Sequence, residues 1–167
     1  MAAISALKGT RFNWQTVTAA TLGFWLSCSL MLDCIIMPGM YVSGMMTQPG
    51  FATAGYSIFW LFNRIELLCA AGVLTGVLAL ANTHERFARR RWTIALSLLL
   101  VAIPVLYTYT LTPMMGALGL QLDWFTADQA IAPAMSQMHN SYWALELTKL
   151  AAGLGMLGFL ANFVTES

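Results

Sequence analysis

The sequence predicts an all-α fold, a four-helix bundle of one domain (residues 1–167) embedded in a membrane with both termini in the cytoplasm. Of its 167 residues, 59% are hydrophobic and only 9% are charged, whereas a soluble domain carries about 25% charged residues. Four long apolar segments and a one-sided distribution of Lys and Arg complete the argument. The net charge of +1 gives no reason to expect a nucleic-acid partner.

Four apolar segments are long enough to cross a bilayer as helices, which takes roughly 20 residues each. The predicted spans are residues 17–41, 54–81, 92–111 and 142–164. The first segment is too long for a signal-peptide core, so we expect it to remain as a helix. Pro104 should kink or loosen the third span, which neighbouring helices make tolerable in lipid. Between the third and fourth spans we expect a short interfacial segment.

The basic residues outside the spans predict the orientation. Six of them lie before the first span or between the second and third: Lys8, Arg11, Arg86, Arg89, Arg90 and Arg91. The two connections on the other side, residues 42–53 and 112–141, contain no Lys or Arg. Because cytoplasmic loops carry the excess of basic residues, six against none places both termini in the cytoplasm.

Small residues mark candidate helix-packing faces. Gly72 and Gly76 form a GxxxG pair in the second span, and Ala151 and Gly155 have the same spacing in the fourth. Small residues allow helices in lipid to approach closely. We expect these faces to pack helices within the chain, and a self-dimer interface is the alternative.

Six polar side chains inside the spans form a candidate intramembrane polar layer: Asp33, Asn63, Arg64, Glu66, Glu146 and Lys149. A charge at the bilayer centre costs at least about 2.5–3.5 kcal/mol on insertion scales, so such groups usually pair or face a polar cavity. With the orientation above, all of them fall in the outer third of the membrane. Glu146 and Lys149 are three residues apart and share a helix face, which favours a local ion pair.

The other members of the layer need partners on other helices. Arg64 and Glu66 point to nearly opposite sides of their helix, so Arg64 should pair with Asp33 or Glu146, while Asn63 is placed to bond Glu66. The layer is interpreted either as a network that fixes the bundle or as a polar site, open outward, for a solute, a proton or a partner subunit. Only scattered hydroxyls continue toward the inner side, which disfavours a through-going transporter.

Methionine pairs and one histidine near the outer side form a candidate metal site: Met37, Met40, Met135, Met138 and His139. Thioethers with an imidazole suit Cu(I), although methionine also fills gaps in apolar surfaces. His84 and His139 lie on opposite sides, which excludes a bis-histidine haem within one chain, and a single pigment or haem ligand at His139 stays open. No cofactor is predicted outright. With no nucleophile–base set, phosphate loop or zinc motif in the sequence, we do not expect an enzyme.

Four segments carry a resemblance: GFWLS (23–27) with MPG (37–39), FNRIEL (62–67) and HNSYWALELTK (139–149). They resemble a four-helix membrane family that includes transmembrane protein 205-like proteins and is distantly similar to copper-resistance-D membrane proteins. The resemblance covers nearly the whole chain, and residues 37–46 and 51–66 are most similar to cyanobacterial members. The first three spans lack histidine, which weakens transfer of a copper or haem role and argues against the similar four-helix protoporphyrinogen oxidases.

The resemblance implies a bacterial plasma membrane or a cyanobacterial thylakoid membrane, where photosystem subunits become candidate partners. The leading hypothesis is a non-enzymatic accessory or assembly subunit that associates with a larger membrane protein complex. The alternative is a copper- or small-solute-handling protein that uses the methionine-rich outer side.

Overall fold

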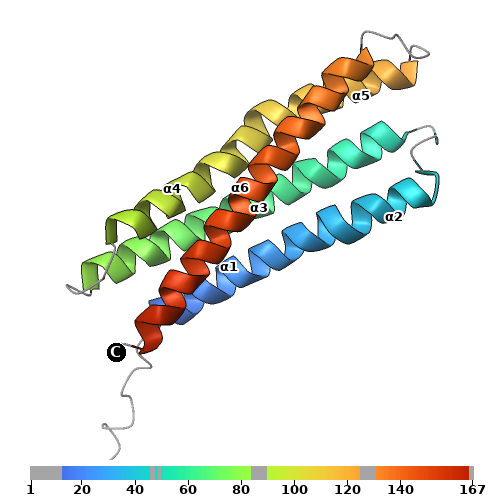
Figure 1. Cartoon of the computed structure of the whole chain (residues 1–167). Helices are drawn as coiled ribbons and strands as arrows, with labels where there is room; N and C mark the ends of the chain where they lie inside the picture. Colours follow the sequence, from blue (N-terminus) through green and yellow to red (C-terminus); the bar gives the residue numbers. More distant parts are fainter. Residues whose placement is uncertain (1–12, 46–47, 49, 84–89, 125–130, 166–167) are drawn as a thin grey trace, which may run out of the picture.

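The computed structural model of the chain describes residues 13–45, 48, 50–83, 90–124 and 131–165. These residues form four helical rods (Figure 1). The first rod comprises α1 (Trp14–Met31), the π-helical turn η1 (Leu32–Ile36) and α2 (Met37–Val42), and the second is α3 (Phe51–Thr83). The third comprises α4 (Arg90–Leu106), the π-helical turn η3 (Tyr107–Leu111) and α5 (Thr112–Trp124), and the fourth is α6 (Ile131–Thr165).

Each rod is long and apolar enough to cross a bilayer, so the chain is an integral membrane protein with an all-α four-helix fold. The candidate spans are Trp14–Val42, Phe51–Thr83, Arg91–Gly119 and Pro133–Ala161. The start of α1, the end of α3, the start of α4 and the end of α6 lie at one end of the bundle (Figure 1). We call this the inner end, because Arg90 and Arg91 open α4 there, and the opposite end the outer end. The predicted basic flanks Lys8, Arg11, Arg86 and Arg89 lie outside the described residues.

The four rods occupy the corners of a square. α1 packs against α3 and α6, and α4 packs against the same two helices. Each helix therefore runs antiparallel to both neighbours, as expected where short connections join successive spans. α3 and α6 stand on opposite corners. The space between the rods is filled by apolar side chains from all of them, among them Leu22, Val73, Leu100 and Met156.

Glycine in α3 brings α1 close. A Cβ at Gly76 would lie 1.9 Å from Thr18 Oγ1, and one at Gly72 would lie 3.6 Å from Thr21. The predicted intrachain role of the GxxxG pair is confirmed.

The predicted intrachain role of the pair in α6 is wrong. Ala151 is exposed, and nothing lies within 4 Å of a Cβ built at Gly155. Gly153, two residues from each of them, lies on the buried side of α6: a Cβ there would lie 2.8 Å from the side chain of Leu26. The sequence spacing identified a small-residue face of α6 but could not say which way it turns.

The third and fourth rods extend further at the outer end than predicted. The prediction ended the third span at residue 111 and began the fourth at residue 142, whereas the helices continue through Trp124 and resume at Ile131. The physical reason is that a helix does not stop at the edge of the apolar layer when its continuation packs. A Cβ at Gly116 would lie 2.5 Å from the ring of Tyr56, so α5 rests closely on the outer part of α3.

Pro104 loosens its helix without ending it. It lies inside α4, where it lacks a backbone N–H and its ring crowds the carbonyl of the preceding turn. The wider turn η3 follows directly, and the Thr108 hydroxyl donates to the Pro104 carbonyl at 2.7 Å. The predicted loosening of the third span is confirmed, and it places Tyr107 at the head of the π-helical turn.

Candidate functional site

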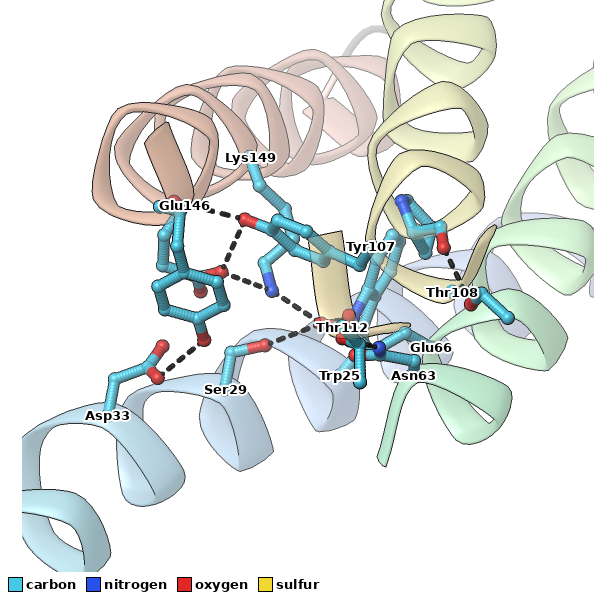
Figure 2. Close-up of polar contacts among 12 residues, drawn as sticks. Trp25, Ser29, Asp33, Asn63, Glu66, Tyr107, Thr108, Thr112, Glu146 and Lys149 are labelled. Atoms are coloured by element: carbon cyan, nitrogen blue, oxygen red, sulfur yellow. Dashed lines mark hydrogen bonds and ion pairs between the residues drawn. The ribbon is translucent and has the colours of Figure 1, made fainter. Parts of the chain in front are cut away.

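A cluster of polar side chains lies between the four rods, near the middle of their length (Figure 2). We call it the polar cluster, and its members are Trp25, Ser29, Asp33, Glu66, Tyr107, Tyr142, Glu146 and Lys149. All four rods contribute, because each member falls on the buried stripe of its own helix. Along the first rod, for example, Trp25, Ser29 and Asp33 follow at intervals of four residues and are all buried.

Lys149 is the cationic centre of the cluster. Its ammonium group forms ion pairs with Glu66 Oε1 and, at 2.7 Å, with Glu146 Oε2. Lys149 and Glu146 are 0% exposed and Glu66 is 1% exposed, so water does not screen these charges. The pairing of Glu146 with Lys149 confirms the sequence prediction. The bond to Glu66 joins α6 to α3 across the diagonal of the square, between helices whose backbones do not pack.

Glu66 also accepts hydrogen bonds from a third helix, α1. The indole Nε1 of Trp25 donates to Glu66 Oε1 at 2.9 Å, and the Ser29 hydroxyl donates to the same oxygen at 3.3 Å. With Lys149, three donors from α1 and α6 converge on one carboxylate oxygen. Such convergence offsets much of the cost of burying an ionised carboxylate.

Two tyrosines complete the outer side of the cluster. The Tyr107 hydroxyl donates to Glu146 Oε2 at 3.1 Å, and the Tyr142 hydroxyl donates to Asp33 Oδ1 at 2.7 Å. Their ring centroids lie 5.1 Å apart, so η3 and α6 are joined by ring contact as well as by hydrogen bonds. Asp33 and Tyr107 both lie in π-helical turns, which occur frequently at functional sites.

Arg64 lies outside the cluster, and its predicted partners are wrong. Its side chain is exposed, donates to the Trp60 carbonyl at 3.1 Å and stacks 3.3 Å from the centroid of the Trp60 ring. Among the described residues no carboxylate forms an ion pair with it. The reason is helical phase: two residues turn a helix by about 200°, so burying Glu66 turns Arg64 outward.

Asn63 is buried but does not bond Glu66 as predicted. Its amide donates to Thr112 Oγ1 at 2.7 Å, which ties α3 to the start of α5. Asn63 lies on the same buried face of α3 as Glu66, but its amide reaches Thr112. Glu66 Oε1 already accepts from Lys149, Trp25 and Ser29. Asn63 therefore joins two helices beside the cluster.

The candidate copper ligands come from two helices that do not pack together within the described residues. Met37 and Met40 lie on α2, while Met135, Met138 and His139 lie near the start of α6. His139 is exposed, and its Nδ1 lies 3.0 Å from the Met135 carbonyl oxygen. Across the described part of the chain, no three His, Cys, Asp or Glu side chains are grouped to hold a metal ion.

Comparison with protein-family models, curated proteins and solved structures gives no match. Four members of the polar cluster went unpredicted: Trp25, Ser29, Tyr107 and Tyr142. For Trp25 and Ser29 the signal was present, since they share the helix face of Asp33. Tyr142 shares a face with Glu146 in the same way. Tyr107 carried no comparable signal, because no ionisable neighbour in its own span marked the face.

Proposed function

We propose that the chain is a non-enzymatic integral membrane subunit that associates with a larger membrane protein complex through its lipid-facing surface. The observation that carries this proposal is Arg64. Inside the bundle, Lys149 forms ion pairs with Glu66 and Glu146. The Arg64 side chain is exposed on the outside of the bundle. A charged side chain in a span usually pairs or faces a polar surface, because exposing it to lipid is costly.

The depth of Arg64 supports a protein partner, because Arg64 lies near the middle of the candidate span Phe51–Thr83. Exposed aromatic side chains nearby in their spans include Trp60, Tyr109 and Trp143, and aromatic residues are enriched at protein interfaces. Arg64 lies one helical turn inward of Trp60, and its stacking on that ring fixes the guanidinium in place. A preorganised guanidinium is suited to a carboxylate of a neighbouring subunit, with which it can form two parallel hydrogen bonds.

A second exposed surface supports the same function. The outward face of α6 carries small side chains at helical spacing: Ala144, Thr148, Ala151, Gly155 and Gly158. In α3, Gly72 and Gly76 pack against α1 within the chain. In α6, by contrast, nothing lies within 4 Å of a Cβ built at Gly155 or Gly158. Small residues at a helix surface permit close approach by another helix. Since α3 and α6 stand on opposite corners, the subunit offers two separate faces to neighbours.

The membrane and the partner class follow from the resemblance alone. Similarity to cyanobacterial members favours a plasma membrane or thylakoid membrane, with photosystem subunits as the first partners to examine. A role in assembly or as an accessory component fits a small chain with short connections between its spans.

Site-specific photo-crosslinking tests the proposal at the face that carries it. A photo-reactive residue replaces Leu68, which is exposed one turn from Arg64 on α3, and the crosslinks are formed in native membranes. We expect a protein adduct that disappears when Arg64→Ala is added and persists in part with Arg64→Lys. Placing the photo-reactive residue at Leu98, exposed on α4, gives the matched control.

Two results would overturn the proposal. One is a crosslink from Leu68 to lipid alone, which would make Arg64 a headgroup contact. The other is an unchanged protein adduct in a correctly folded Arg64→Ala variant. An Arg91→Ala variant, which removes an exposed arginine at the inner end of α4, controls for a general loss of positive charge.

A further inference from the structure

Two carboxyl groups of the polar cluster face each other. Asp33 and Glu146 are hydrogen-bonding neighbours. Each also accepts from one tyrosine of a stacked pair, Tyr142 for Asp33 and Tyr107 for Glu146. Both are acceptors when ionised, so a hydrogen bond between them requires that one carry a proton. Glu146 Oε1 is buried and has no other hydrogen-bond partner, and a buried acceptor without a donor is costly. The carboxyl pair therefore lacks one donor.

The charges around this pair lead to the same conclusion. The cluster contains three carboxyls, of Asp33, Glu66 and Glu146, and one ammonium group, of Lys149. Full ionisation would leave a net charge of −2 (three negative, one positive) in a buried space. Glu66 Oε1 is served by three donors, and Glu146 Oε2 by two. Glu146 Oε1 has no donor, so a proton on the Asp33–Glu146 pair would supply a hydrogen bond and lower the net charge.

We propose that the Asp33–Glu146 carboxyl pair is a binding site for a single proton, shared between the first and fourth spans. Every packed element presents its titratable or charged groups to this site: Asp33 from η1, Glu66 from α3, Tyr107 from η3, and Tyr142 and Lys149 from α6. Like charges this close cannot both ionise readily, which is the physics of a shared-proton carboxylate pair. All the groups that form this site belong to the chain itself, so the proposal does not require a partner subunit.

The site exchanges its proton with the outer side. Asp33 bonds Tyr142, which lies one helical turn outward of Glu146, so Asp33 is the member nearer to the outer end. Toward the inner end, the described buried polar side chains carry only hydroxyls: Thr18, Thr93 and Ser97. The proton therefore binds and leaves from one side, and its loss places two negative charges between α6 and η1.

Infrared spectroscopy of the full chain in lipid nanodiscs tests the site, because a protonated carboxylic acid has a C=O stretching band that a carboxylate lacks. We expect this band in the wild type at neutral pH, shifted by ¹³C labelling of Asp and Glu side chains and lost as the pH is raised. Asp33→Asn and Glu146→Gln should each abolish it, since the remaining carboxyl then accepts from an amide. Tyr142→Phe keeps both carboxyls and should retain the band at a shifted frequency.

Absence of the band from the wild type at neutral pH would overturn the proposal, and this measurement needs no variant to fold. Persistence of the band at full intensity in both Asp33→Asn and Glu146→Gln would also overturn it by placing the proton elsewhere. A carboxylate signal that responds to Na⁺ in place of pH would assign the site to a metal cation and exclude the shared proton.

Discussion

Replacing Lys149 with Met should destabilise the bundle more than any other change at a single charged position. Met keeps an unbranched apolar side chain but removes the ammonium group that pairs with Glu66 and, at 2.7 Å, with Glu146. Hydrogen bonds to charged groups contribute about 1.5–3 kcal/mol each, which gives about 3–6 kcal/mol for two. Removing one partner of a buried ion pair costs about 3–5 kcal/mol. We therefore expect a loss of about 3–5 kcal/mol in the free energy of unfolding.

The assay is reversible unfolding in mixed micelles with increasing denaturing detergent, followed by far-UV circular dichroism. Arg64→Met is the matched control: it also removes a basic charge from a span, but from the exposed surface, and should cost less than about 1 kcal/mol. Adding Glu66→Gln to Lys149→Met should recover part of the loss by removing one unpaired buried charge. A loss below about 1 kcal/mol for Lys149→Met would refute the assignment of Lys149 as the centre of the cluster.

Two further substitutions test the packing and the outer side of the cluster in the same assay. Gly76→Ala should cost about 1–3 kcal/mol, because its Cβ would lie 1.9 Å from Thr18 Oγ1, whereas Gly155→Ala has open space and should change stability by less than about 0.5 kcal/mol. Equal effects of the two would contradict the α1–α3 contact. Tyr107→Phe should cost about 1–3 kcal/mol by removing a donor from buried Glu146, while Tyr109→Phe, at an exposed position, should be nearly neutral. A neutral Tyr107→Phe would remove Tyr107 from the cluster.

Composition and hydropathy were sufficient to predict the fold class, because burial in lipid imposes a strong constraint on each span. A helix must satisfy its own backbone and present about 20 apolar residues, and both requirements are visible in the sequence. The outer ends were less predictable. The continuation of α5 to Trp124 depends on contact with α3, including the close approach of Gly116 to Tyr56, and hydropathy contains no information about that contact.

The polar cluster was predictable only in part. Helical spacing correctly paired Glu146 with Lys149 and turned Arg64 away from Glu66. It could not assign Glu66 to Lys149, because that bond crosses the bundle between two helices of unknown relative height. The partners chosen for Arg64 were wrong for a related reason. The prediction assumed that an intramembrane charge must be satisfied within the chain, whereas here it is exposed on the surface and available to a neighbour.

The native particle mass of the tagged chain, extracted gently from its own membranes, tests the central claim most directly. We expect a particle much larger than one chain in its detergent, with other membrane proteins comigrating, and a shift to smaller particles in Arg64→Ala. A monomer or small homo-oligomer free of other proteins, unchanged by Arg64→Ala, would contradict the proposal that this chain is a subunit of a larger complex.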